Sequence, residues 1–185
     1  MSESLLAGQS SYGLPLLPVP YTLRGYNHLT SKSVTAFLHI YENSYLNHEW
    51  FVKADDDTFI IVEHLRDFLR LKDPSEPITY GYNFKKLVEN GYHSGGASYV
   101  LSKEALKRLY FAYKSRYKLC KNDGGDEDVE IARCLRTVDV YPGESLDSAG
   151  KEMFHPEPFE LHFEGIKWLS KYSMNSVKTV SCFLF

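Results

Sequence analysis

The sequence predicts an α/β fold with a largely parallel sheet and flanking helices, because short apolar strands alternate with amphipathic helices along most of the chain. The strand-like runs are Trp50-Phe51-Val52 and Ile78 to Tyr82, and the run from Gly95 to Leu101 indicates a glycine-led strand or loop. With 43% apolar and 15% aromatic side chains, the 185 residues can bury the core of a single domain.

Four helices are expected between and after these runs, each from an apolar stripe with a spacing of three and four residues. The first covers Thr30 to Tyr45, with Thr30 or Ser31 as its N-cap. The second has its stripe at Val62, Leu65, Phe68 and Leu69 and is ended by Asp73-Pro74-Ser75. The third begins after Ser102, whose hydroxyl can cap it, and the fourth follows the Gly124-Gly125 turn.

The net charge limits which classes of partner the chain can bind, and the cysteines bear on the redox state of its compartment. A formal net charge of -3 gives no basic field that could follow a phosphate backbone, so nucleic acid is not an expected partner. The three cysteines are too few and too scattered for a disulfide-dense scaffold or a zinc site. Cys120 and Cys134 flank a turn-rich segment, which favours a bridge in an oxidising compartment and leaves Cys182 unpaired. Two unlinked thiols of a cytosolic protein are the alternative that the spacing leaves open.

An acidic triplet, Asp55-Asp56-Asp57, follows the first predicted strand. Three adjacent carboxylates repel one another unless a cation or strong hydrogen-bond donors lie nearby. On an extended segment Asp55 and Asp57 point to the same side, where hard oxygen ligands suit Mg²⁺ or Mn²⁺ and leave positions for water and a diphosphate. The triplet therefore predicts a clamp for a metal and a diphosphate, with a solvated acidic loop as the alternative.

Three stretches carry motifs in a fixed order: Glu49 to Thr58 with the acidic triplet, Gly91 to Ala105 with Gly95-Gly96, and Glu127-Asp128-Val129-Glu130-Ile131. Together they resemble the core 1 β-1,3-galactosyltransferases of glycosyltransferase family 31, over roughly residues 30 to 155. The resemblance implies a GT-A-type, Rossmann-like fold, UDP-galactose as donor and Mn²⁺ as cofactor. It also implies inverting transfer of galactose to O3 of GalNAc on serine or threonine of a glycoprotein.

The resemblance assigns roles to the acidic residues. Asp55 and Asp57 match the two ends of the family's D-x-D and are the expected metal ligands, with Asp57 the more direct one. Asp56 is expected to act through water or by orienting its neighbours. Asp128 matches the catalytic carboxylate, the base that takes the proton of the acceptor hydroxyl. The alternative is that Glu127 and Asp128 only complement the dipole at a helix N-terminus.

Gly95 and Gly96 are expected at the donor site, because the absence of side chains lets the backbone approach a ligand closely. A bulge without a ligand is the alternative. His162 superficially resembles a family histidine that completes the metal shell. Its position soon after His155 instead matches an earlier family segment, so His162 is not assigned as a ligand.

The expected organisation is an irregular arm over residues 1–20, part of a glycosyltransferase catalytic domain over 21–165, and a divergent tail over 166–185. The family's signal anchor, stem and uridine-holding strands are expected to be missing before Tyr21, and its metal-ligand histidine from the other end. The resemblance implies a location on the lumenal side of the Golgi membrane, to which the protein is attached through that missing anchor. It is also compatible with a homodimer.

Other functions stay open beside core 1 galactosyl transfer. The chain could belong to a β-1,3-glycosyltransferase that transfers GlcNAc or that joins galactose to another acceptor. It could be an inactive fragment or a non-catalytic folding partner, although such a partner is expected to lose the D-x-D that this chain keeps. A calcium-binding module is disfavoured because the ligand spacing of a 12-residue calcium loop is absent.

Overall fold

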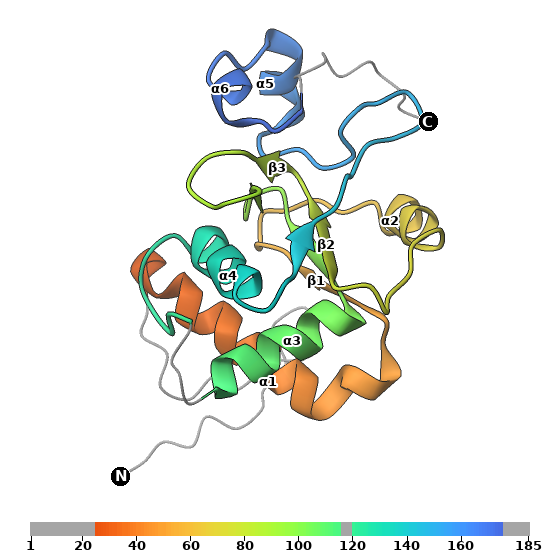
Figure 1. The fold of residues 1–185 in the computed structure, drawn as a ribbon. Coiled ribbons are helices and arrows are strands. Elements are labelled where there is room, and N and C mark those ends of the chain that lie inside the picture. Colours follow the sequence, from red (N-terminus) through yellow and green to blue (C-terminus); the bar gives the residue numbers. More distant parts are fainter. Residues whose placement is uncertain (1–24, 116–119, 176–185) are drawn as a thin grey trace, which may run out of the picture.

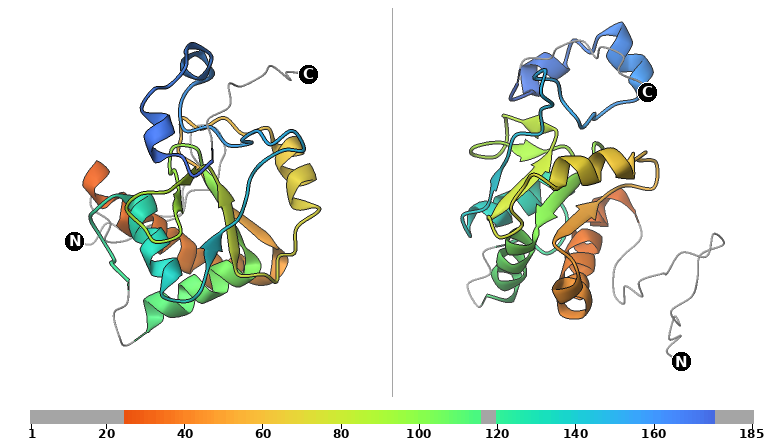
Figure 2. Two further views of the ribbon diagram at one scale, coloured as in Figure 1. Left: turned by 45° about the horizontal axis from the view of Figure 1, so that its top comes forward. Right: turned by 90° about the vertical axis from the view of Figure 1, so that its right-hand side faces the viewer.

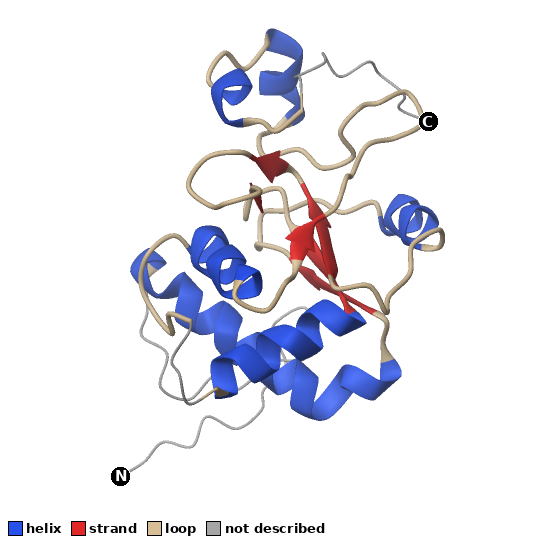
Figure 3. Cartoon of the chain, viewed as in Figure 1, coloured by secondary structure: helices blue, strands red, loops and turns tan. Residues whose placement is uncertain are grey.

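The computed structural model describes residues 25–115 and 120–175, and it places a small central sheet between helices (Figures 1 and 3). The strands are β1 (Trp50–Lys53), β2 (Ile78–Gly81), β3 (Asn83–Phe84), β4 (Tyr92–His93), β5 (Tyr99–Ser102) and β6 (Tyr141–Pro142). The helices are α1 (Leu29–Ser44), α2 (Val62–Leu69), α3 (Lys103–Lys114), α4 (Glu127–Arg136), α5 (Phe159–Glu164) and α6 (Leu169–Tyr172). The predicted α/β class with flanking helices is confirmed. The arm predicted over residues 1–20 lies outside the described residues.

The main sheet is mixed, so the prediction of a largely parallel sheet is wrong. Its order is β1-β5-β2-β6, in which β5 runs antiparallel to both β1 and β2, and only β2 and β6 pair in parallel. The reason lies between β2 and β5, where the antiparallel β3–β4 pair reverses the chain. β1, β2 and β6 still run in one direction, and β5 is inserted between the first two.

The two faces of the sheet pack against different helices. In β5, which is buried throughout, Tyr99 and Leu101 point into a core shared with α1, α3 and α4, whereas Val100 points into a second core that includes Leu69 of α2. Figure 2 shows α2 on one side of the sheet and α1 and α3 on the other. β1 lies at an edge of the described sheet, since it pairs only with β5 among the described strands and leaves Val52 exposed.

The predicted helices are confirmed, with one correction at a cap. Ser102 caps α3 as expected, since its Oγ accepts a hydrogen bond from the Ala105 amide at 3.0 Å. α1 starts earlier than predicted, because a 3₁₀ turn over Tyr26–His28 leads into it and His28 takes the cap position. Thr30 is therefore not the cap. Its buried hydroxyl donates to the Gly124 carbonyl at 3.0 Å and ties α1 to the loop before α4.

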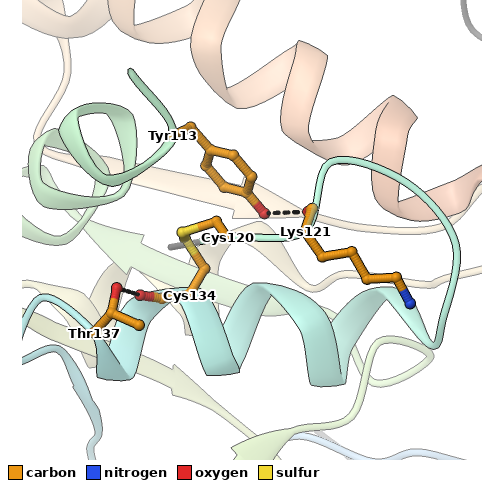
Figure 4. Close-up of a disulfide and its surroundings, with 5 residues drawn as sticks. All are labelled: Tyr113, Cys120, Lys121, Cys134 and Thr137. Carbon is orange, nitrogen blue, oxygen red and sulfur yellow. Dashed lines mark hydrogen bonds between the residues drawn. A yellow bond between two sulfur atoms is a disulfide. The ribbon is translucent and has the colours of Figure 1, made fainter. Parts of the chain in front are cut away.

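Cys120 and Cys134 form a disulfide with a Cα–Cα distance of 4.9 Å, as predicted (Figure 4). Cys134 is buried in the core face of α4. Next to the bridge, the Tyr113 hydroxyl donates to the Lys121 carbonyl at 3.3 Å. The disulfide therefore holds the segment before α4 against the C-terminal part of that helix. Cys182 lies outside the described residues.

The segment with α5 and α6 lies at the opposite end of the molecule from α1 and α3 (Figures 1 and 2). α6 is joined to the small β3–β4 sheet, since the Lys85 amide donates to the Tyr172 carbonyl at 2.7 Å and Leu169 is fully buried. The domain boundary at residue 165 stays a prediction. None of the helices in the described part of the chain is both long and apolar enough to cross a membrane.

Candidate active site

One pocket of about 440 Å³ brings the three sequence motifs together. Its walls come from the turn after β1, the loop between β4 and β5, and the start of α4. Every predicted site residue lines it: Asp55, Asp56, Asp57, Gly95, Gly96 and Asp128. Sequence separations of about 40 and 30 residues between the motifs are closed because β1 and β5 are paired and α4 packs beside β4.

The acidic triplet lies in a turn and not on the extended segment that was expected. The Thr58 amide donates to the Asp55 carbonyl at 3.2 Å, and the Asp55 amide donates back to the Thr58 hydroxyl at 3.1 Å. The argument from strand alternation is therefore wrong. All three carboxylates line the pocket because the turn, with its own hydrogen bonds, carries them past the end of β1.

Asp128 is fixed at the start of α4 and faces the glycine loop. Its Oδ2 accepts from the Gly95 amide at 2.9 Å, and its Oδ1 accepts from the Val129 amide at 2.8 Å. Burial raises the pKa of Asp128 above its usual value, although these two hydrogen bonds act in the opposite direction. Asp128 thus lies at the N-terminus of α4, where a negative charge is favourable, and it also lines the pocket. This position is compatible with both roles considered from the sequence, the catalytic base and the helix-start residue.

Lys53 connects the acidic motifs, and sequence reasoning missed it. Its ammonium lies 2.6 Å from Asp55 Oδ1 and 3.6 Å from Glu127 Oε2. Burial on its own lowers the pKa of Lys53, but Glu127 and Asp55 together outweigh that effect and leave the pKa raised. A lysine two residues before three adjacent carboxylates was the signal in the sequence that could have identified it.

Glu127 is the buried partner on the other side of Lys53. Its Oε1 accepts from the Tyr99 hydroxyl at 2.7 Å, and its side chain is 5% exposed. Burial raises the pKa of Glu127, against the opposing effects of Lys53 and Tyr99. Glu127 was considered from the sequence only as a helix-start residue, and its inward direction is set by the packing of α4 on β5.

Comparison with known protein families decides the ancestry. The model of a family described as Fringe-like matches residues 24–181, which includes all three motifs. The chain belongs to the Fringe-like family. This Fringe-like chain is 44% identical, over 76% of its length, to the Xenopus laevis protein named glycoprotein-N-acetylgalactosamine 3-beta-galactosyltransferase 1, of which it covers 39%.

Two further relatives of this Fringe-like chain carry other names. It is 27% identical, over 95% of its length, to a Mus musculus beta-1,3-glucosyltransferase, of which it covers 36%. It is 28% identical, over 70% of its length, to Homo sapiens chondroitin sulfate synthase 3, of which it covers 16%. The chain thus spans less than two fifths of the length of each of these relatives.

The donor set of this Fringe-like site fits a hard divalent cation. Among the described residues, no three histidine, cysteine or acidic side chains form a metal-binding group. Mg²⁺ and similar ions are nevertheless usually held by one or two carboxylates together with phosphate oxygens and water. Asp56 and Asp57 are exposed and form no ion pair with a described residue, so their oxygens are available to such an ion.

His93, His155 and His162 of this Fringe-like domain do not line the pocket. His93 is buried, its Nε2 lies 2.9 Å from the Thr79 hydroxyl, and burial lowers its pKa to about 3. His155 and His162 pack with ring centroids 4.9 Å apart and do not line the pocket. Neither takes the place of the family's metal-ligand histidine among the described residues.

Proposed function

We propose that this chain is the catalytic part of a metal-dependent galactosyltransferase with a GT-A-type fold. It transfers galactose from UDP-galactose to GalNAc α-linked to serine or threonine, with inversion, and forms the β-1,3 linkage of core 1 O-glycans. The observation that carries the proposal is the convergence of the three motifs in one pocket. The 44% identity to a protein whose name states this transfer supports the choice of donor sugar and acceptor.

Asp55 and Asp57 hold Mn²⁺, and Asp56 orients the turn or reaches the ion through water. When bound there, a divalent ion would supply positive charge against the charge that develops on a departing UDP diphosphate. The turn closed by Asp55 and Thr58 supports this role, because its own hydrogen bonds hold the carboxylates at the pocket. Asp57 is the more direct ligand, since Asp55 already shares one oxygen with Lys53.

Asp128 removes the proton of the acceptor hydroxyl. An inverting transfer needs a base on the face opposite the leaving group, and one carboxylate is sufficient. The two backbone amides fix both oxygens of Asp128, and each oxygen keeps lone-pair capacity for the incoming proton. The raised pKa supports the role, because a carboxylate that binds a proton more readily is a stronger base.

Gly95 and Gly96 let the donor approach the backbone of the loop. Neither glycine has a positive φ. A methyl group on either would meet its neighbours only at ordinary contact distances, with the shortest at 3.4 Å for Gly95 and 3.7 Å for Gly96. The described fold alone therefore does not require glycine at these positions, which supports a ligand as the reason and disfavours a bulge without one.

The setting is the lumenal side of the Golgi, with attachment to the membrane through a signal anchor, and the enzyme assembles as a homodimer. The disulfide supports an oxidising compartment. A second donor sugar, glucose, is the alternative that the similarity to the mouse beta-1,3-glucosyltransferase over 95% of the chain favours.

The test is a transfer assay on the 185-residue chain with Mn²⁺ and benzyl α-GalNAc as acceptor. UDP-galactose, UDP-glucose and UDP-GlcNAc are offered separately, and products are identified by mass spectrometry and by digestion with a β-1,3-specific galactosidase. We expect a galactosylated product that is lost with chelator and absent in Asp128→Asn. If product formed only from UDP-glucose, the donor would be assigned as UDP-glucose and the galactosyltransferase assignment would be wrong. No product and no Mn²⁺-dependent UDP binding by the folded chain would contradict the catalytic proposal and favour the folding-partner alternative.

A further inference from the structure

Lys53 occupies a position that the proposed chemistry does not use. Its side chain is 14% exposed, and it reaches two carboxylates that belong to different motifs, Asp55 beside the expected metal and Glu127 beside the expected base. It also lies 3.5 Å from the Gly95 carbonyl. A buried ammonium between two carboxylates needs at least one of them as a partner at all times.

The nearer of the two carboxylates is also an expected metal ligand. Lys53 Nζ lies 2.6 Å from Asp55 Oδ1, a short charge-assisted hydrogen bond. While that bond exists, one Asp55 oxygen is taken and a second cation nearby is repelled. An ion that is to be held by Asp55 therefore competes with Lys53.

Glu127 offers the ammonium a second place. Its Oε1 is occupied by the Tyr99 hydroxyl, whereas Oε2 faces Lys53 at 3.6 Å. A rotation of the Lys53 side chain can close that gap without exposing either group, because the Glu127 side chain is only 5% exposed. In the observed position the Lys53 ammonium lies over the Tyr99 ring, with Nζ 6.0 Å from the ring centroid.

We propose that Lys53 is an internal cation that occupies Asp55 in the absence of metal and is transferred to Glu127 when a divalent ion binds. Glu127 is thus a positioning residue for metal loading. This inference rests on the proposed function, because it takes Asp55 to be a metal ligand. It adds a role for two side chains that the D-x-D and the base do not need for their own chemistry.

The decisive variant is Lys53→Met combined with Glu127→Gln, which removes both charges and leaves no buried ion unpaired. Free Mn²⁺ is measured by its electron paramagnetic resonance signal during titration of the full 185-residue chain without nucleotide. Competition predicts that the double variant binds Mn²⁺ more tightly than the wild type, by roughly two- to fivefold, the change in affinity that corresponds to the upper part of the range for ion pairs near a protein surface. The double variant leaves the net charge of the chain unchanged, since one positive and one negative charge are lost together.

The single variant Glu127→Gln should weaken Mn²⁺ binding by a similar factor, because Lys53 then has only Asp55 as an ionic partner. Lys114→Met with Glu42→Gln is the matched control, since that pair lies 3.1 Å apart outside the pocket. It should leave the affinity unchanged. Equal Mn²⁺ affinity in the wild type and the Lys53/Glu127 double variant overturns this inference but leaves the metal part of the proposed function intact. No Mn²⁺ binding by either protein overturns both.

Discussion

Opening the Cys120–Cys134 bond should lower the free energy of unfolding by about 3 kcal/mol. The two cysteines are 14 residues apart, and the loop-closure entropy of a chain that long gives about this value at 25 °C. For a domain of this size, the same loss lowers the thermal midpoint by roughly 6 to 12 °C. The native contacts around Cys134 should persist, because it is 1% exposed and packs as a small apolar side chain.

The assay is urea unfolding followed by tryptophan fluorescence, since Trp50 packs against the second core and reports its loss. The chain is measured oxidised and reduced, and Cys120→Ser serves as the control that reductant should not affect. Thiol labelling with mass spectrometry verifies the state of the bond in each sample. Coincident unfolding curves for verified oxidised and reduced chain would refute the entropic reasoning.

Three further changes test the site and the fold. Asp57→Ala should weaken Mn²⁺-dependent UDP binding in calorimetry, whereas Asp128→Asn should spare that binding and abolish transfer, because the ion acts on the donor and the base on the acceptor proton. Lowering the pH from about 6.5 towards 3 should destabilise the fold, because His93 binds a proton in the unfolded chain but not in the folded one, where burial lowers its pKa to about 3. The free energy of unfolding should fall by about 1 kcal/mol per pH unit, and this dependence should be smaller in His93→Gln. Gly143→Ala should lower stability by about 1 to 3 kcal/mol because its Cβ would lie 2.5 Å from a core ring carbon, whereas Gly96→Ala should keep the stability and weaken nucleotide binding.

Each of these expectations has an opposing result. Normal turnover in Asp128→Asn would end the assignment of the base and leave Asp128 as a helix-start residue. An acid slope that is unchanged in His93→Gln would place the pH dependence on other groups, such as His155, whose pKa burial lowers to about 4. Wild-type UDP affinity in Gly96→Ala would return that glycine to a loop without a ligand.

The local periodicities and short-range chemistry were sufficient to place most elements. The stripe from Val62 to Leu69 predicts α2, which ends at Leu69 and thus a few residues before the expected stop at Asp73, and the Ser102 hydroxyl predicts the start of α3. Both depend on interactions within a few residues, which the sequence carries directly. The cap of α1 was misplaced because Thr30 makes its hydrogen bond with Gly124, a partner 94 residues away that no local pattern reveals.

The sequence by itself was sufficient to predict the family, because the order and spacing of the motifs can be read without coordinates, and the family match confirms that prediction. The chemical roles of Asp55, Asp57 and Asp128 stay predictions. Only the tertiary structure decided the direction of β5, since the β3–β4 pair that reverses the chain is two residues long in each strand and leaves no periodic signal. It likewise decided that Lys53 lies between Asp55 and Glu127. That contact spans 74 residues of chain and exists only because β1 pairs with β5 and α4 packs behind them, so its ion pairs depend on folding rather than on neighbours in sequence.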